Sequence, residues 1–270
     1  MNKKIWLLAL VGAVLWGQPV WAQDFYVIAG GGVGTRITSL PYTISNPGFY
    51  YLTGNLSFSG TGTGITVASD DVTIDLMGFR ISGPGSSAFG IYLFDGTTGH
   101  KNVEVRNGTL TGWQYGLSDG SAATSQNNRA LNLRVKNCSQ TGISLASGGG
   151  NQVKGCIADS CNIGILVFSG AVSGCAATNC ATGIYGAGTI SGNTVSNIAG
   201  LGNTGIIITD ASNVSGNTVI TSDGTQIGIN ALSPALLGSP VLVIQNTLSG
   251  PGLHLWGLGG ASVVVVNNAG

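Results

Sequence analysis

The chain has 270 residues, of which 46 are glycine and only 7% are charged, with ten basic and ten acidic side chains. Val, Ile and Leu are plentiful and regularly placed, which excludes a disordered Gly-rich linker. Without Lys3 and Lys4 of the amino-terminal segment, eight basic residues stand against ten acidic ones, a net charge of about −2. This balance excludes the basic footprint of a nucleic-acid-binding protein, so we expect no nucleic-acid partner.

The first 22 residues have the pattern of a secretory signal peptide. Lys3 and Lys4 precede an apolar stretch from Ile5 to Trp16, and Val20-Trp21-Ala22 has the small-residue character of a cleavage site. The apolar stretch is too short to span a bilayer, and no later segment reaches the required length. We therefore expect a secreted or periplasmic protein without a membrane span.

After this segment the sequence predicts a linker over residues 23–40 and a single domain over residues 41–270. The segment from Pro41 to Leu56 has enough material for an amino-terminal cap.

A glycine followed by an aliphatic residue recurs along the whole domain at intervals of 19 to 26 residues, a period typical of solenoid repeats. The nine copies are Gly64-Ile65, Gly90-Ile91, Gly116-Leu117, Gly142-Ile143, Gly164-Ile165, Gly183-Ile184, Gly205-Ile206, Gly228-Ile229 and Gly252-Leu253. Helical periodicity is absent, and short strands end in turns where Gly or Asn tolerates a positive φ. The fold class is all-β: a single-stranded parallel β-helix of about nine coils, stacked at about 4.8 Å.

A second recurring column marks the end of a strand in each coil. Aligning these ends predicts one ladder of stacked turn residues: Cys138, Cys156, Cys175, Asn193, Asn217 and Asn246. Stacked Asn side chains can hydrogen-bond along the axis. A shorter stack would pair Cys161 with Cys180. The five cysteines are interpreted as inert buried thiols, with disulfides between neighbouring coils as the alternative.

The "SGNTV" copies at 191–195 and 215–219, the Cys and Asn ladders and the Gly-Ile anchors resemble the pectate-lyase-like superfamily of right-handed parallel β-helices. The segment "ITSLPYTISNPGFYYLTGNL", continuing to "GITVASDDVTIDLMGFRISG", is similar to the opening module of many secreted bacterial β-helix proteins. The resemblance implies a right-handed coil. It does not select one activity, because this architecture carries lyases, hydrolases, epimerases, adhesins and tail spikes.

The activity motifs of these enzymes are incomplete here. Asp70-Asp71 and Arg134-Val135-Lys136 are similar to two motifs of the polygalacturonase-like hydrolases, but the sequence contains no Gly-His-Gly or Asn-Thr-Asp. The lyases of the superfamily need clustered carboxylates for calcium, and no dense acidic cluster is visible. We expect no cofactor, with calcium only if the protein is a lyase. His100 and His254 are far apart in the sequence, so no metal site is predicted.

One outward column of the domain is basic. Asp75, Arg106, Lys136, Lys154, Ser173, Ser191 and Ser215 are expected to stack, with Thr73, Glu104, Arg134 and Gln152 beside them. Arg106, Arg134, Lys136 and Lys154 would bind the carboxylates or sulfates of an acidic polysaccharide. The alternative is a ladder of surface ion pairs, Asp75 with Arg106 and Glu104 with Arg134, each contributing about 0–1 kcal/mol.

The same stripe also contains the candidates for catalysis. Asp75 and Glu104 would lie diagonally on adjacent coils, near the separation of the carboxyl groups in inverting hydrolases, with Arg134 next to them. Loop residues such as Asp95, Asp119, Arg129 and Asp210 are further candidates whose positions depend on turns that the sequence does not place.

A third column follows the Gly-Ile anchors. Its outward residues read Tyr92, Ser118, Ser144, Leu166, Tyr185, Ile207, Asn230 and His254. Tyr92 and Tyr185 offer ring faces on which a sugar can stack. A lateral protein contact or a covering loop would explain this partly apolar column equally well.

The sequence therefore favours a non-catalytic surface or matrix protein that binds an acidic polysaccharide or a cell-surface glycan, or that associates with itself. Homo-oligomers would form through the last coil, where the apolar strand "SVVVVNNAG" has no evident cap. The alternative function is a polysaccharide lyase or glycoside hydrolase acting on a uronate-containing polysaccharide.

Overall fold

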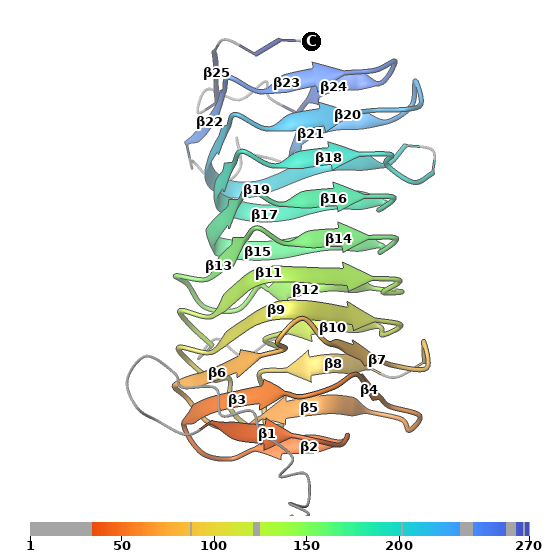
Figure 1. Ribbon diagram of the computed structural model, residues 1–270. Coiled ribbons are helices and arrows are strands. Elements are labelled where there is room, and N and C mark those ends of the chain that lie inside the picture. Colours follow the sequence, from red (N-terminus) through yellow and green to blue (C-terminus); the bar gives the residue numbers. More distant parts are fainter. Residues whose placement is uncertain are drawn as a thin grey trace, which may run out of the picture. The chain divides into compact units, whose positions relative to one another are not determined.

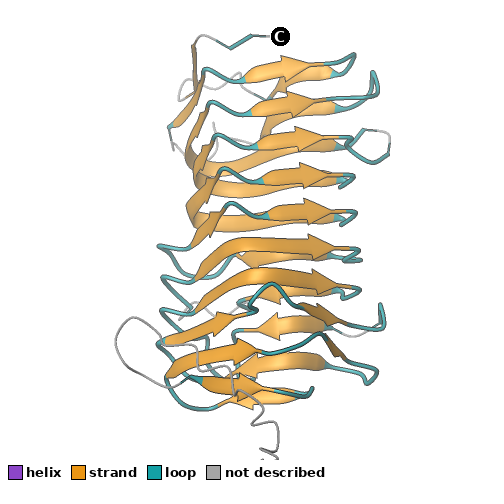
Figure 2. Ribbon diagram, in the orientation of Figure 1, coloured by secondary structure: helices purple, strands orange, loops and turns teal. Residues whose placement is uncertain are grey.

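The structure, a computed structural model, describes residues 34–86, 88–120, 125–200, 202–232, 240–257, 263–266 and 268–269. The predicted signal peptide lies outside the described residues. Gly34–Gly270 form one compact unit. Its described residues form parallel strands and loops and no helix, so the all-β prediction is confirmed (Figure 2). No described helix has the length and apolar character that a membrane crossing requires.

The strands wind into about nine right-handed coils with three parallel sheets, named here A, B and C (Figure 1). Sheet A contains β2 (Tyr42–Ile44), β5 (Thr63–Val67), β8 (Phe89–Tyr92), β10 (Tyr115–Ser118), β12 (Thr141–Leu145), the first halves of β15 (Ile163–Ser173), β17 (Thr182–Ser191) and β19 (Thr204–Ser215), then β21 (Ile227–Ala231) and β24 (Leu253–Trp256). Sheet B contains β1 (Thr35–Ile37), β3 (Gly48–Leu52), β6 (Val72–Asp75), the first halves of β9 (Glu104–Thr111) and β11 (Arg129–Lys136), β13 (Gln152–Lys154), the second halves of β15, β17 and β19, then β22 (Val241–Ile244) and β25 (Val263–Val266). Sheet C contains β4 (Leu56–Ser57), β7 (Arg80–Ser82), the second halves of β9 and β11, then β14 (Ile157–Asp159), β16 (Ala176–Thr178), β18 (Thr194–Ser196), β20 (Thr218–Ile220) and β23 (Thr247–Ser249).

The first coil begins earlier than the predicted domain boundary. β1 lies within the segment expected as a linker and pairs with β3. The segment expected as a cap supplies β2 and β3, which pair with strands of the next coil.

The first eight Gly-Ile anchors, from Gly64 to Gly228, occupy the same position in successive coils of sheet A, whereas Gly252-Leu253 lies two residues before it, because Leu253 pairs with Ile227 and Leu255 with Ile229. Their aliphatic residues stack in the core, as Ile143 pairs with Leu117 on one side and Ile165 on the other. The glycines have no room for a side chain: a Cβ on Gly142 would lie 2.7 Å from the carbonyl oxygen of Gly164. The repeated glycines of the sequence therefore lie where neighbouring coils approach each other most closely.

The corner between sheets B and C carries the ladder of buried polar side chains. Oδ1 of Asn217 accepts the backbone N–H of Asn193 at 3.0 Å and its Nδ2 at 2.9 Å. Asn217 in turn donates to Asn246, and Asn246 donates to Asn268, which extends the predicted ladder by one coil. Each amide thus satisfies the backbone of the coil before it.

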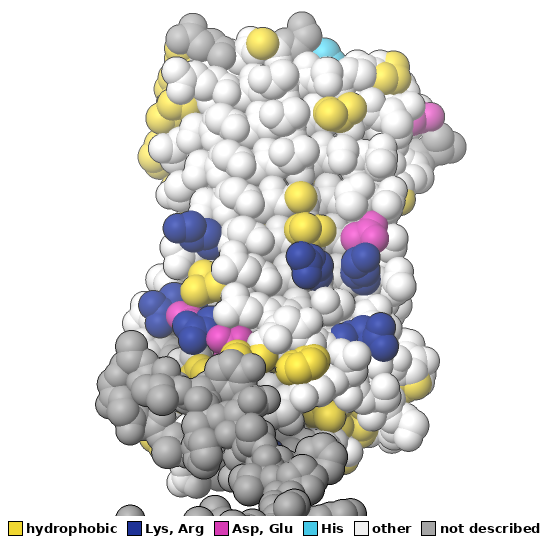
Figure 3. All heavy atoms as spheres, in the orientation of Figure 1, with side chains coloured by type: hydrophobic (Ala, Val, Ile, Leu, Met, Phe, Trp, Pro, Cys, Tyr) yellow, Lys and Arg dark blue, Asp and Glu magenta, His cyan; other side chains and the backbone are white. Residues whose placement is uncertain are grey.

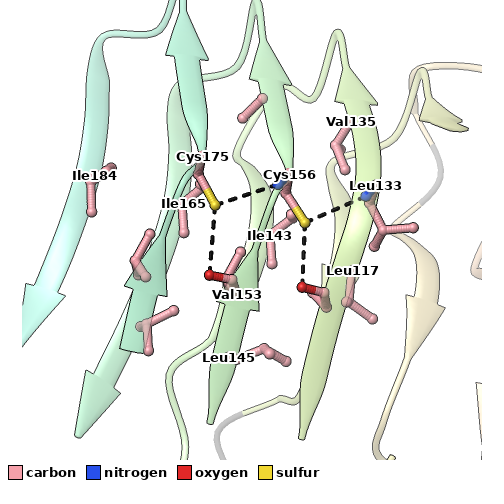
Figure 4. Close-up of a cluster of buried hydrophobic side chains, with 14 of the residues drawn as sticks. Leu117, Leu133, Val135, Ile143, Leu145, Val153, Cys156, Ile165, Cys175 and Ile184 are labelled. Atoms are coloured by element: carbon pink, nitrogen blue, oxygen red, sulfur yellow. Dashed lines mark hydrogen bonds between the residues drawn. The ribbon is translucent and has the colours of Figure 1, made fainter. Parts of the chain in front are cut away.

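Sulfur replaces the amide in the middle coils of this ladder. The N–H of Cys156 donates to Sγ of Cys175, and the N–H of Leu133 donates to Sγ of Cys156, both at 3.4 Å (Figure 4). Leu133 therefore occupies the place that the sequence assigned to Cys138. Cys138 lies at the corner between sheets C and A, in register with Cys161 and Cys180.

The misplacement of Cys138 in the predicted ladder has a physical origin in β11. This strand crosses the corner from sheet B to sheet C without a break, so its two halves carry two similar strand ends. The motif Val135-Lys-Asn-Cys matches Val153-Lys-Gly-Cys in letters, but Val153 pairs with Ala130.

All five cysteines are buried free thiols in the structure. Sγ of Cys161 donates to the carbonyl oxygen of Asp159. The contact with Cys138, together with burial, raises the pKa of Cys161 to about 12. A thiol that stays protonated at physiological pH is a poor nucleophile, so this geometry supports the interpretation as inert packing.

The last described strands have exposed apolar side chains at Trp256, Val264 and Val266. Self-association through the last coil stays a prediction.

The ladder yields a test of stability. Asn217→Ala leaves the N–H of Asn193 and the carbonyl of Ile190 without their partner, and each orphaned buried group costs about 1–3 kcal/mol. We expect the free energy of unfolding, measured in urea, to fall by at least about 2 kcal/mol. Asn213→Ala, at an exposed position of β19 just before this turn, is the control and should change it by less than about 0.5 kcal/mol. Equal losses in the two variants would contradict the role of the ladder.

Candidate functional site

Four charged side chains form an ion-pair network on the outer face of sheet B. Nε of Arg106 lies 2.8 Å from Oδ2 of Asp75, and Nη1 of Arg106 lies 2.9 Å from Oε1 of Glu104. Nη2 of Arg129 lies 3.1 Å from Oε2 of Glu104. The two carboxylates are buried, whereas the side chain of Arg129 is 50% exposed.

The oxygens of Asp75 and Glu104, the two carboxylates considered for catalysis, are occupied. Asp75 also accepts the N–H of Met77 and Nδ2 of Asn107, in addition to Arg106. Glu104 accepts one arginine on each oxygen. These charge-assisted hydrogen bonds hold both carboxylates in fixed positions on the outer face of sheet B.

The register corrects the expected position of Arg134. Glu104 pairs with Arg129, so the ion pair predicted between Glu104 and Arg134 is made by Arg129 instead. Arg134 lies on sheet C, where it pairs with Thr109 and Ile157. The pair of Asp75 with Arg106 is as predicted.

The basic stripe is likewise divided between two sheets. Arg106 and Lys154 lie on sheet B, on either side of Leu131. Lys136 lies on sheet C between Thr111 and Asp159. The continuous strand β11 again explains the difference, because the sequence alignment placed its second half on sheet B.

Together the outer faces of sheets B and C, from β6 to β14, nevertheless form one basic face (Figure 3). Six basic residues stand against three acidic ones, a net charge of +3 in a chain whose formal net charge is zero. The basic residues are Arg80, Arg106, Arg129, Arg134, Lys136 and Lys154, and the acidic residues are Asp75, Glu104 and Asp159.

A polar groove of about 710 Å³ runs beside this face, along the corner between sheets A and B. Each of five successive coils contributes a turn residue, the first outward residue of sheet B, or both. The lining consists of Asp71, Thr73, Asn102, Asn127, Arg129, Gly150, Asn151, Gln152, Gly170 and Ala171. Four coil spacings give the groove a length of about 19 Å along the axis of the coils. We call it the A–B groove.

The A–B groove offers amide and hydroxyl groups with Arg129 midway along it. Asn102 donates from Nδ2 to Oδ1 of Asp71 at 2.9 Å at the amino-terminal end. These polar groups line the groove almost without apolar side chains, so a ligand there would be held by hydrogen bonds and charge. The sequence missed the groove because Arg129 was placed in a loop, although its register opposite Glu104 marks it as a strand residue.

A second, smaller groove of about 390 Å³ follows the opposite edge of sheet B. Arg134 is its charged lining residue, and Asn107, Asn132 and Ile157 also contribute. The two grooves therefore border the outer face of sheet B on both sides, and the second groove lies within the basic face, between its sheet B and sheet C residues.

The tyrosines of sheet A lie apart from both grooves. Tyr92 stacks on Phe89, with ring centroids 3.8 Å apart, and meets the edge of Phe94. Tyr185 contacts Phe168 edge-on. The column ends at Trp256 and not at His254, because Asn230 pairs with Trp256. Protein contacts thus cover part of the ring faces that the sequence offered to a sugar.

Asp119 is a buried carboxyl group at the end of β10. Its oxygens accept the N–H groups of Ala146 and Ser147 at 3.1 and 2.9 Å. Burial outweighs these donors and raises the pKa of Asp119 to about 7. Its position lies outside the linings of the two grooves, so the structure gives it a role in holding the loop after β12.

No group of three or more His, Cys, Asp or Glu side chains suited to a metal ion occurs in the described part of the chain.

The family model described as "Right handed beta helix region" matches residues 46–195, more than half of the chain. No curated protein matches the chain. An alginate lyase from Paenibacillus sp. str. FPU-7 has 16% sequence identity and a TM-score of 0.51, with 87% of this chain and 85% of that chain covered. The A-module of a mannuronan C-5 epimerase from Azotobacter vinelandii has 13% identity and a TM-score of 0.47, with 90% and 92% covered. Endopolygalacturonase I from Stereum purpureum has 14% identity and a TM-score of 0.39, with 87% and 95% covered. At these identities the likeness shows the fold alone.

The pKa of Asp119 predicts a pH dependence. The folded state holds a proton that the unfolded chain releases near pH 4, so stability falls as pH rises from about 4 to 7 and is level above that range. We expect a loss of up to about 4 kcal/mol in the free energy of unfolding over this interval. Asp119→Asn should remove this slope in urea unfolding measured at pH 4, 5.5 and 7. An unchanged slope in the variant would show that Asp119 is not the group responsible.

Proposed function

Because the chain belongs to the family of right-handed β-helix proteins, whose stacked coils here form an axial groove beside a basic face, we propose that it binds an acidic polysaccharide without changing it chemically. The A–B groove is the binding site, and Arg129 is the principal contact for the carboxylate or sulfate groups of the ligand. The protein would act outside the cytoplasm as a surface or matrix component. The observation that carries the proposal is the position of Arg129 midway along the groove.

The shape of the groove supports a linear polymer as the ligand. Equivalent residues recur at about 4.8 Å along the groove, so a chain lying parallel to the axis meets a new set of polar groups at each coil. Asn127 and Gln152 flank Arg129 in the lining and can donate to hydroxyl groups. A compact ligand would use only part of this length.

The electrostatics support an anionic ligand. Arg129 has one carboxylate partner, Glu104, and half of its side chain is exposed. Its planar guanidinium can therefore also donate to a ligand carboxylate or sulfate. The net charge of +3 on the adjoining face adds a longer-range attraction that salt weakens.

A non-catalytic role is supported by the engagement of Asp75 and Glu104 with arginine. The alternative, a lyase or hydrolase for uronate-containing polysaccharides, has one observation in its favour: the carboxylate of Asp71 lines the groove and its residue is exposed. The binding experiment must therefore include an assay of turnover.

Binding should be measured by isothermal titration calorimetry with oligosaccharides of alginate and polygalacturonate, and with a neutral glucan as the comparison ligand. Arg129→Gln should weaken binding of the acidic oligosaccharides at least tenfold, about 1.4 kcal/mol, because it removes the charged contact and leaves Arg106 on Glu104. Arg36→Gln is the matched control, since it removes an exposed charge of β1 outside the groove, and should change affinity less than twofold.

The same ligands should be incubated with the protein, with and without calcium, and followed for new reducing ends and unsaturated products. The proposal predicts no turnover. Turnover that Asp71→Asn abolishes would replace it with the enzymatic alternative. Equal affinity for the neutral glucan, or unchanged affinity in Arg129→Gln, would contradict acidic recognition in the groove.

A further inference from the structure

The turns along the A–B groove form one column with a shared backbone conformation. Four successive coils place Asp71, Asn102, Asn127 and Gly150 in this column, with φ values of 56°, 55°, 55° and 72°. Each of these residues donates its N–H to a carbonyl oxygen of the next coil, at 3.0 or 3.1 Å. These bonds fix the turns relative to one another, so the order of chemical groups along the groove is a fixed property of the site.

Of the described residues that line the groove, only Asp71 and Arg129 are charged, and their charges have opposite sign. Asp71 belongs to the first of the five coils that form the groove. Arg129 belongs to the third, because it pairs with Glu104, which pairs in turn with Thr73 of the first coil. Two coil spacings, about 9.6 Å along the axis, therefore separate the two charges.

The carboxylate of Asp71 is held at the rim of the groove. Its Oδ1 accepts Nδ2 of Asn102 at 2.9 Å, and the residue is exposed. Asp71 takes part in none of the ion pairs between described residues, and the neighbouring cation Lys101 lies outside the lining. The negative charge of Asp71 therefore acts on whatever lies in the first two coils of the groove.

On the other side of Arg129 the groove is uncharged. The fourth and fifth coils contribute Gly150, Asn151, Gln152, Gly170 and Ala171. Apart from the two amides, these residues offer a ligand only backbone groups, and Lys154, two residues after Gln152, lies outside the lining. A carboxylate placed here would lose water without gaining a charged partner, whereas the hydroxyl groups of a neutral sugar would find hydrogen-bonding groups.

A polymer with a carboxylate on every sugar conflicts with this order of groups. One sugar of an extended chain is comparable in length to one coil spacing, about 4.8 Å. With one carboxylate on Arg129, those of the next sugars would approach Asp71 on one side, where like charges repel, and uncharged groups on the other. Because Arg129 is the one cation of the described lining, sliding the chain along the groove does not remove the conflict.

We propose that Asp71 is a specificity-determining residue of the A–B groove, and that the ligand is an acidic heteropolysaccharide in which several neutral sugars separate the acidic ones. The acidic sugar would bind Arg129, and neutral sugars would occupy the coils on either side. This inference rests on the proposed function and specifies the class of polysaccharide that the same groove takes.

The test compares two probes of equal length and different charge spacing by isothermal titration calorimetry. The first is polygalacturonate oligosaccharide, with a carboxylate on every sugar; the second is gellan oligosaccharide, in which neutral sugars separate the glucuronates. Asp71→Asn should raise the affinity for the polygalacturonate probe at least about threefold, because it removes the repulsion, and should change that for the gellan probe by less than about 1.5-fold. The amide oxygen of the variant can still accept Nδ2 of Asn102.

Asp223→Asn is the matched control, because it removes the same charge from a loop residue outside the groove, where Asp223 accepts the N–H and Oγ1 of Thr225. It should change the affinity for either probe by less than about 1.5-fold. Circular dichroism should show the same strand content in every variant.

Arg129→Gln separates this inference from the proposed function. If Arg129→Gln weakens binding of both probes while Asp71→Asn changes the two affinities equally or not at all, the specificity of Asp71 is overturned and the proposed function stands. If Arg129→Gln leaves both affinities unchanged, the proposed function fails and the specificity fails with it. Turnover of either probe that Asp71→Asn abolishes would give Asp71 a catalytic role and also overturn the inference.

Discussion

The structure depends on one constraint: every coil must present its backbone to the next coil at hydrogen-bonding distance, around all three sheets and at their corners. Along the strands, parallel pairing satisfies this requirement. At the corner between sheets B and C, Asn193, Asn217 and Asn246 satisfy it with side-chain amides, and Cys156 and Cys175 with sulfur. In sheet A the same constraint leaves no room for a Cβ at the glycine of each anchor.

A third corner obeys the same rule and supports the candidate site. Oδ1 of Asn128 accepts the N–H of Val103, and Oδ1 of Asn151 accepts the N–H of Asn128, both at 2.9 Å. These buried amides fix the turns between sheets A and B, and Asn127 and Arg129 lie on either side of Asn128 in the lining of the A–B groove. The groove is thus a consequence of stacking: one turn residue per coil, repeated, becomes a continuous polar channel along the axis.

The sequence predicted the fold because the close stacking of coils requires the glycines of the Gly-Ile anchors and the SGN turns, and these residues repeat visibly along the chain. It predicted the register less well, because register depends on where each strand turns a corner. β11 passes from sheet B to sheet C with no glycine to mark the turn; Asn132, with a positive φ, takes that place. The alignment therefore moved Arg134 and Lys136 onto the wrong sheet and put Arg129 in a loop. A similar shift of two residues put His254 where Trp256 lies. Contacts such as that of His100 with Asp95 come from loop geometry, on which periodicity carries no information.

Different coils therefore contribute the charges that make the basic face, and only their common stacking brings Arg106, Arg129 and Lys154 together. The central claim is that an acidic polysaccharide uses this arrangement by lying along the axis. A crystal structure of the protein with a bound uronate oligosaccharide tests it most directly. The account predicts the sugar chain in the A–B groove, parallel to the axis, with a carboxylate on Arg129. A chain bound across the outer face of sheet A, at Tyr92 and Tyr185, would contradict it.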